Sequence, residues 1–227
     1  MPVLSTHAPL SALAQILHAA RALGHDAWNG GGATPRQGSP DELTDDIRAL
    51  FTLLNQRRTP YLLVGDIALL KYTEGRNTDD IDLLLSLESL KAVPEISLTD
   101  QNKDFGRGRL RSAPVNLVFT SNPVYQLVRD KCATTHQFAE LDVRCATVEG
   151  LVLLKLYALP SLYRRGDGQR IGLYENDIFM LCQRNRPDTK AILDVLKRHM
   201  DADAYRELCN IMSDIDRRIM RVDRRSP

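Results

Sequence analysis

Two aspartates separated by a single residue, Asp80 and Asp82, are the most chemically suggestive feature of the sequence. They begin the segment DIDLLL, residues 80–85, which has the composition of a buried strand. Because side chains alternate between the two faces of a strand, both carboxylates project to one side and Ile81 projects to the other. Neighbouring carboxylates repel each other unless a cation lies between them. The spacing therefore predicts a site for a hard divalent ion with oxygen ligands, with Mg²⁺ as the natural candidate and Mn²⁺ as the alternative.

The residues before this pair must position it. Three elements are expected there: a strand over residues 61–64, a turn at Gly65 and Asp66, and a short helix over residues 67–72. A polar loop then leads into the aspartate strand. Residues 41–56 carry acidic residues in their first turns and apolar residues at helical spacing, so a helix is expected to lead into the first strand.

Residues 76–83, RNTDDIDL, resemble the motif Arg-x-Thr-x-Asp-Ile-Asp-Leu of the nucleotidyltransferase superfamily, the fold shared by polymerase beta, the CCA-adding enzymes and small bacterial toxins. The resemblance implies an α+β fold: a nucleotidyltransferase-like mixed sheet flanked by helices, with a C-terminal helical region and an N-terminal helical arm. It also implies a metal-dependent enzyme that moves a nucleoside monophosphate from a nucleoside triphosphate to an acceptor hydroxyl, on RNA such as tRNA.

The resemblance implies roles for particular residues. Asp80 and Asp82 would bind the metal ion and act in catalysis. The nucleotide-binding residues that it implies in this half of the chain are Gly65, Asp66, Arg76 and Thr78. The turn at Gly65 would let backbone N–H groups approach the phosphates. Asp66 stands where the family usually has Gly or Ser, and its carboxylate would repel a triphosphate unless it binds metal or points away.

Asn116 is the main departure from the family pattern. It lies in residues 109–119, RLRSAPVNLVF, which predict a strand, at the place where the family commonly supplies a third carboxylate. An amide offers a metal a neutral oxygen without the charge that would help to deprotonate a hydroxyl. Two alternatives therefore stay open: a degenerate, weakly active domain that binds nucleotide, RNA or a protein, and a purely structural α/β module.

Residues 147–160 predict an apolar helix that ends at Pro160 and contains Lys155. A lysine among leucines usually extends to the surface. The resemblance gives it another role, because AbiEii-like abortive-infection toxins carry a lysine that faces the nucleoside triphosphate in a helix reading L-x-x-L-K-x-x-A. Residues 151–158, LVLLKLYA, match that helix, so Lys155 is implied to be catalytic and nucleotide-binding.

Two further features follow that helix. Residues 162–174 are basic and contain glycine, so a loop near phosphates is expected, with Arg164 and Arg165 as nucleotide-binding residues. The next helix resembles the family's Asp-Ile helix, and Asp177 matches its acidic residue. Asp177 would either hold Lys155 or the acceptor in place, or be an exposed carboxylate without a role.

The chain is expected to have three parts. Residues 1–40 would form an N-terminal helix, over residues 10–23, and a linker rich in Gly, Pro and Ser; residues 41–146 would form the catalytic core; residues 147–227 would form a helical region. Residues 100–107 are expected to be a loop. The resemblance to toxins also implies an antitoxin partner.

Composition limits the classes of protein that the sequence suits. With 43% hydrophobic and 26% charged residues, the 227-residue chain has globular proportions, and its formal charge of +1 gives no overall field that would attract nucleic acid. A local patch such as Arg107, Arg109 and Arg111 would have to do so. The four cysteines lack close pairs, which argues against a zinc site, and no apolar run predicts a membrane span; a reduced, cytoplasmic protein is expected.

Overall fold

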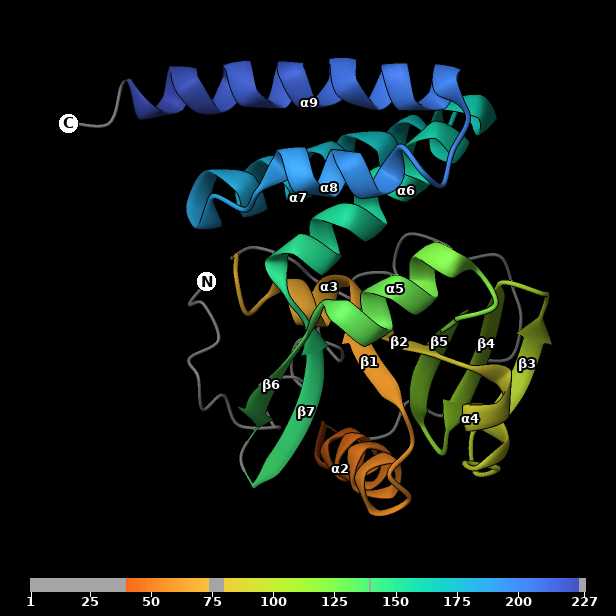
Figure 1. Cartoon of the computed structure of the whole chain (residues 1–227). Helices are drawn as coiled ribbons and strands as arrows, with labels where there is room; N and C mark the ends of the chain where they lie inside the picture. Colours follow the sequence, from red (N-terminus) through yellow and green to blue (C-terminus); the bar gives the residue numbers. More distant parts are fainter. Residues whose placement is uncertain (1–39, 74–79, 139, 225–227) are drawn as a thin grey trace, which may run out of the picture. The chain divides into compact units, whose positions relative to one another are not determined.

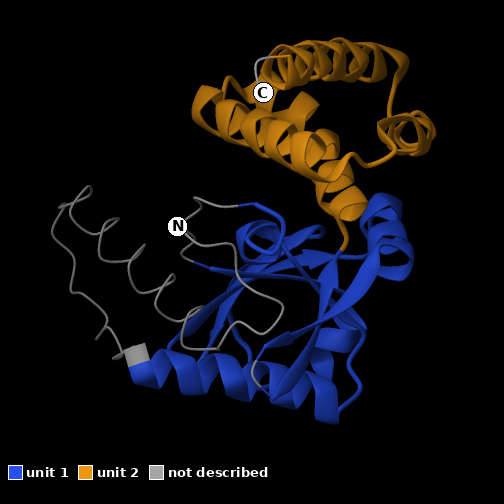
Figure 2. Ribbon diagram, turned by 90° about the vertical axis from the view of Figure 1, so that its left-hand side faces the viewer, with its two compact units in different colours: residues 1–146 blue, residues 147–227 orange. Residues whose placement is uncertain are grey.

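The computed structural model describes residues 40–73, 80–138 and 140–224 (Figure 1). The N-terminal helix expected over residues 10–23, and the nucleotide-binding residues Arg76 and Thr78, lie outside these ranges. The chain divides into two compact units, Met1–Ala146 and Thr147–Pro227 (Figure 2). None of the helices in the described ranges has the length and hydropathy of a membrane span.

Unit 1 is built on a seven-stranded sheet with the strand order β3-β4-β5-β2-β1-β7-β6. The strands are β1 (Tyr61–Val64), β2 (Ile81–Leu85), β3 (Ser97–Gln101), β4 (Phe105–Leu110), β5 (Ala113–Phe119), β6 (Ala133–Phe138) and β7 (Leu141–Ala146). β1 pairs antiparallel with β2 and parallel with β7, while β2 pairs parallel with β5. The described helices of this unit are α2 (Pro40–Gln56), α3 (Gly65–Leu69), α4 (Leu87–Lys91) and α5 (Pro123–Lys131). The expected α+β fold with a mixed sheet is confirmed.

The core of unit 1 follows the hydrophobic pattern of its elements. All four residues of β1 are buried, as expected for a central strand covered on both faces. The apolar stripe of α2 packs inward, and the ring centroids of Phe51 and Tyr61 lie 5.9 Å apart. Along β5, buried residues alternate with half-buried ones, so one face of this strand is less covered than the other. Asn116 lies on the less covered face.

The prediction for the segment before β5 is wrong in two respects. Residues 100–107 form the end of β3, a short connection over residues 102–104 and the start of β4 rather than one loop, and residues 109–119 form parts of two strands joined by a turn. Arg111 has a positive φ of 52° in that turn. Asp46 of α2 holds the turn, because its Oδ2 accepts hydrogen bonds from the backbone N–H (2.8 Å) and the hydroxyl (2.6 Å) of Ser112. Because the turn depends on Asp46, which is distant in the sequence, the local sequence pattern did not predict it.

Unit 2 consists of α6 (Val148–Arg165), α7 (Gly168–Asn185), α8 (Thr189–Leu196) and α9 (Ala202–Asp223). The expected C-terminal helical region is confirmed. All four helices have N-cap side chains that accept a backbone hydrogen bond: Thr147, Asp167, Asp188 and Asp201.

Two expectations for this unit are wrong. α6 continues through Pro160, which is buried, and ends five residues later at Arg165, before Gly166 in the left-handed conformation (φ 66°). The apolar pattern of α6 continues past the proline to the buried Leu162, so packing keeps the helix intact there. The loop expected over residues 162–174 is therefore mostly helix, with only a short connection between α6 and α7.

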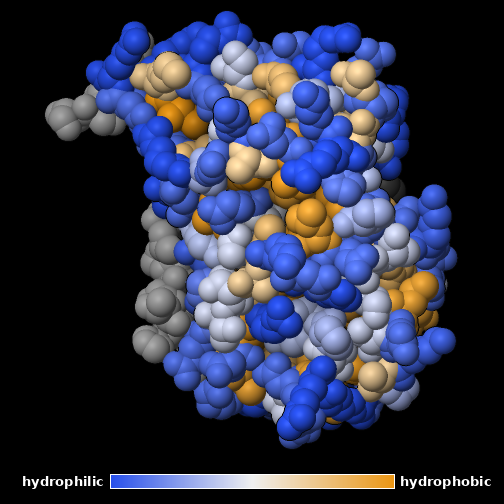
Figure 3. Space-filling view, in the orientation of Figure 1, coloured by the Kyte–Doolittle hydropathy of each residue, from blue (hydrophilic) through white to orange (hydrophobic). Residues whose placement is uncertain are grey.

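The four cysteines are free thiols. Burial raises the pKa of Cys145 and of Cys182 to about 12, so both thiols stay protonated at neutral pH. Cys182 is a core residue, whereas Cys209 is half-buried. On the face drawn in Figure 3, hydrophobic residues form separate patches among hydrophilic ones.

Candidate metal and nucleotide site

Asp80 and Asp82 lie together on one face of the sheet, as their spacing predicts. Asp80 immediately precedes β2, Asp82 is its second residue, and both are half-buried. The side chain of Asn116, which pairs in register with Asp82 on β5, donates hydrogen bonds to both carboxylates: 3.1 Å to Asp80 Oδ2 and 3.1 Å to Asp82 Oδ1. Asp80 Oδ2 and Asp82 Oδ1 therefore lie at most 6.2 Å apart, which is twice the 3.1 Å distance from each to the Asn116 nitrogen. The parallel pairing of β2 with β5 brings the three side chains together.

Gly65 forms the wall of the site beside Asp82. The antiparallel pairing of β1 with β2 sets Val64 opposite Asp82, so the turn after Val64 passes next to that carboxylate. Gly65 has a φ of +68°, and a Cβ built on it would overlap Asp82 Oδ2 and lie 2.6 Å from Cγ and 2.8 Å from Cβ of Asp82. Both the backbone conformation and the lack of space therefore require glycine here. The sequence predicted this turn, because Gly65 and Asp66 follow an apolar strand.

Asp66 lies in the first turn of α3, next to Gly65, and is half-buried. It belongs to the same turn that passes beside Asp82. An acidic residue suits the N-terminal end of a helix dipole, which gives Asp66 a local reason to be there that is independent of any ligand.

The donor set is suited to a hard divalent ion. Two carboxylates on one strand face supply charged oxygens, and the Asn116 amide can present its carbonyl oxygen if it rotates. Within the described residues no group of three or more His, Cys, Asp or Glu side chains is arranged to hold a metal. The site thus has two acids and one amide, in place of the three acids of the family pattern.

Changing Asn116 to aspartate is expected to make unit 1 more dependent on Mg²⁺. Without metal, Asn116→Asp replaces two hydrogen bonds to charged oxygens with repulsion among three carboxylates, and we expect the free energy of unfolding to fall by about 2 kcal/mol. Mg²⁺ should restore most of that loss. Urea denaturation in EDTA and in Mg²⁺ measures both values.

The control is Asn102→Asp, because Asn102 uses only its side-chain oxygen, accepting hydrogen bonds from the N–H groups of Asp104 and Phe105 (2.9 Å each). An aspartate there can accept the same bonds, so its stability should not depend on Mg²⁺. An Asn116→Asp protein that is equally stable in EDTA and in Mg²⁺ would show that the three side chains do not converge as described.

In unit 2, Lys155 of α6 and Asp177 of α7 form a buried ion pair. The Lys155 side chain is 8% exposed and that of Asp177 is 2% exposed, and Nζ lies 2.8 Å from Oδ2. Nζ also lies 4.5 Å from the ring centroid of Tyr174 in α7. Lys155 therefore does not extend to the surface, and Asp177 is not an exposed carboxylate.

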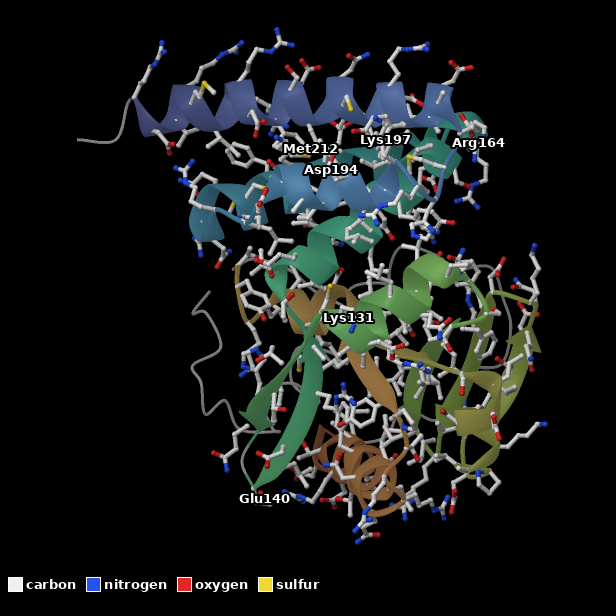
Figure 4. All side chains as sticks on the ribbon, in the orientation of Figure 1. Lys131, Glu140, Arg164, Asp194, Lys197 and Met212 are labelled. Atoms are coloured by element: carbon white, nitrogen blue, oxygen red, sulfur yellow. The ribbon has the colours of Figure 1, made fainter. Side chains whose placement is uncertain are left out.

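The structure does not bring Arg164 and Arg165 together with Lys155. Both arginines are exposed in the last turn of α6, nine and ten residues beyond Lys155, which is roughly 14 Å along the helix axis. Figure 4 shows Arg164 at this end of the helix. The pKa of Asp201, at the start of α9, is lowered chiefly by the hydrogen bond from the N–H of Ala204 and in part by the charge of Arg164. The two arginines thus lie at a helix end instead of in the expected loop.

No protein-family model matches the sequence, and no curated protein matches it. Solved structures with a similar fold include an antigenic nucleotidyltransferase-like protein from Paracoccidioides brasiliensis, with a TM-score of 0.46, 16% identity, and coverage of 73% of this chain and 93% of that one. Two structures of the antibiotic-resistance factor ANT(2″)-Ia also have TM-scores of 0.46. The solution structure is 14% identical and covers 80% of this chain and 97% of its own. The complex with adenylyl-2″-tobramycin is 13% identical, and the match covers 74% of this chain and 95% of that one. At these values the likeness assigns neither substrate nor residue roles, and the finer resemblance to AbiEii-like toxins stays a prediction.

Proposed function

We propose that this protein is a Mg²⁺-dependent nucleotidyltransferase that moves a nucleoside monophosphate from a nucleoside triphosphate to an acceptor hydroxyl. The observation that carries the proposal is the convergence of Asp80 and Asp82 on one amide of Asn116, beside a turn in which Gly65 leaves no room for a side chain. A purely structural sheet has no need for two acids on the same face held 3.1 Å from one nitrogen.

The residues of unit 1 would divide the work as follows. Asp80 and Asp82 would hold the ion, which when bound neutralises charge on the triphosphate and on the departing pyrophosphate. Asn116 keeps the two carboxylates close together, and the Gly65 turn offers backbone next to them. The acceptor oxygen forms a bond to the α-phosphorus while the bond to the β-phosphate oxygen breaks. Pyrophosphate leaves with that electron pair, and the hydroxyl proton passes to solvent.

The test is transfer of label from each α-labelled nucleoside triphosphate to total RNA in Mg²⁺. Asp82→Asn keeps the shape of the side chain and removes its charge, and we expect it to lower the rate of transfer at least about 100-fold. Asp142→Asn, an exposed acid of the same sheet, is the matched control and should transfer at the wild-type rate. Equal rates in Asp82→Asn and the wild type would contradict the proposed site.

The acceptor that we propose is RNA such as a tRNA end, and the toxin role with an antitoxin partner is part of the same proposal. The resemblance of residues 151–158 and 175–181 to AbiEii-like helices supports it. Growth arrest on expression of the wild type, absent with Asp82→Asn, is the expected result. Transfer of label to RNA without growth arrest would support the transferase activity and contradict the toxin role.

A degenerate domain that binds nucleotide without transferring it is the second candidate. Asn116 favours it, because an amide stands at the position of the third acid and donates to the other two. This candidate predicts a thermal shift with Mg²⁺ and a nucleoside triphosphate, lost in Asp82→Asn, but no labelled product with any acceptor.

The phosphate-binding role expected for Lys155 and the positioning role expected for Asp177 stay predictions. Their ion pair already gives both residues a function in joining α6 to α7. The chemistry proposed for unit 1 needs neither of them.

A further inference from the structure

One exposed row of side chains on β4 lies outside the site described so far. Phe105, Arg107 and Arg109 alternate along the strand and point to one face, and all three are exposed, Phe105 by 46%. The Phe105 ring contacts the ring of Tyr125 on α5 edge-on, with centroids 6.0 Å apart. The row thus combines an exposed aromatic ring with two guanidinium groups.

This row shares a face with the aspartates. In register, Arg107 of β4 lies opposite Asn116 of β5, and Asn116 lies opposite Asp82 of β2. Residues opposite each other in neighbouring strands project to the same side, and the hydrogen bond from Asn116 to Asp82 shows that these two do so. Figure 1 shows β4 beside β5 in this sheet. The row is therefore two strand spacings, roughly 10 Å, from the carboxylates.

The alternating glycines of β4 explain why the side chains gather on this face. A Cβ on Gly108 would lie 2.5 Å from the carbonyl oxygen of Ser97, and one on Gly106 would lie 3.0 Å from the Phe119 ring. The other face of β4 therefore has almost no room at these two positions. The pattern F-G-R-G-R is set by this crowding on one side and by open space on the other.

The two arginines are not committed to ion pairs in the described part of the chain. No salt bridge there involves Arg107 or Arg109, whereas Arg111 lies 3.4 Å from Asp46 in the turn before β5. The nearest acid in register is Asp100 of β3, which lies opposite Arg107 and forms no ion pair with it. Among the described residues, the guanidinium groups of the row thus have no acidic side chain paired with them that would explain a structural role.

We propose that Phe105, Arg107 and Arg109 bind the single-stranded end of an RNA acceptor. The inference rests on the transferase function proposed above and names the surface that would recognise its acceptor. Guanidinium groups bind backbone phosphates and an exposed aromatic ring stacks on a base, which together are the features of surfaces that bind single strands. A chain whose terminal hydroxyl reaches Asp82 would place its preceding phosphates over β4, because the two strands are roughly 10 Å apart.

Binding of a fluorescent, mixed-sequence RNA of about 12 nucleotides to the full chain tests the surface. The double variant Arg107→Gln/Arg109→Gln removes two charges and keeps the side-chain stems. A plot of the logarithm of the binding constant against the logarithm of the salt concentration has a negative slope. We expect the double variant to make that slope less negative by about 1.4, or 0.7 for each lost phosphate contact. Phe105→Ala should weaken binding about fivefold or more through lost stacking. Arg58→Gln, at an exposed arginine in the turn after α2, is the control and should bind like the wild type.

The outcomes separate this surface from the catalytic proposal. If the double variant keeps the wild-type salt slope and KM for RNA while Asp82→Asn abolishes transfer, the protein is a transferase whose acceptor binds elsewhere. If Arg58→Gln weakens binding as much as the double variant, the effect is one of overall charge and the surface is wrong. If poly-glutamate competes as well as unlabelled RNA of equal charge, the row is a general anion surface and the RNA assignment fails.

Discussion

Replacing Gly65 with alanine is expected to lower the free energy of unfolding of unit 1 by about 2–5 kcal/mol and to abolish nucleotide transfer. The left-handed conformation, with φ at +68°, disfavours any residue with a Cβ by about 1–2 kcal/mol. The added carbon would also lie 2.6 Å from Asp82 Cγ, and relieving such overpacking typically requires another 1–3 kcal/mol. The group that must move is the carboxylate proposed to hold the metal, so stability and activity fall together.

Urea denaturation and label transfer measure the two effects. Gly172→Ala is the matched control, because a Cβ there meets nothing within 4 Å and the residue lies inside α7. Alanine is the better helix former, so this change should stabilise unit 2 by roughly 0.5–1 kcal/mol. Retention of wild-type stability and transfer in Gly65→Ala would mean that β1 and β2 do not approach each other at Asp82 as described.

Lys155→Met is expected to lower the free energy of unfolding of unit 2 by about 3–5 kcal/mol. The change keeps the apolar stem and removes the ammonium group that lies 2.8 Å from Asp177 Oδ2, which leaves a carboxylate with 2% exposure without that charge. Removing one partner of a buried ion pair costs this much because the remaining charge has lost the water that would solvate it. Lys190→Met, at an exposed lysine on α8, should change stability by less than about 0.5 kcal/mol.

The double variant Lys155→Met/Asp177→Leu distinguishes a charge effect from a packing effect. Apolar side chains of similar volume often replace a buried ion pair with little loss, so the double variant should recover most of the stability lost in Lys155→Met. Chemical denaturation of the two single variants and the double variant gives the coupling energy. A stable double variant that still transfers nucleotide normally would remove Lys155 and Asp177 from the catalytic set.

Local pattern in the sequence was sufficient for part of the site. The alternation in Asp-Ile-Asp placed Asp80 and Asp82 on one strand face, and the glycine after an apolar strand predicted the turn at Gly65. These features depend on strand periodicity and on the conformational freedom of glycine, which act over a few residues. For the same reason the helix over residues 40–56 and the strand over residues 61–64 were predicted nearly to the residue.

Features that depend on long-range contacts were not predicted from the sequence. The turn at Arg111 is held by Asp46, which lies 66 residues before Ser112 in the chain. Because that contact is absent from the local pattern, residues 109–119 were predicted to form a single strand. The continuation of α6 through Pro160 is decided by packing of the helix in unit 2, which outweighs the local effect of proline.

The sequence by itself determined that two acids share a strand face, that a glycine turn precedes them, and that the chain combines α and β structure. Only the tertiary structure decided that Asn116 donates to both acids, that Lys155 is buried against Asp177 and Tyr174, and that Arg107 lies on the same face as Asp82. Strand periodicity is a local property of the backbone, whereas the neighbours of a side chain depend on strand order and helix packing, which no short segment of sequence contains.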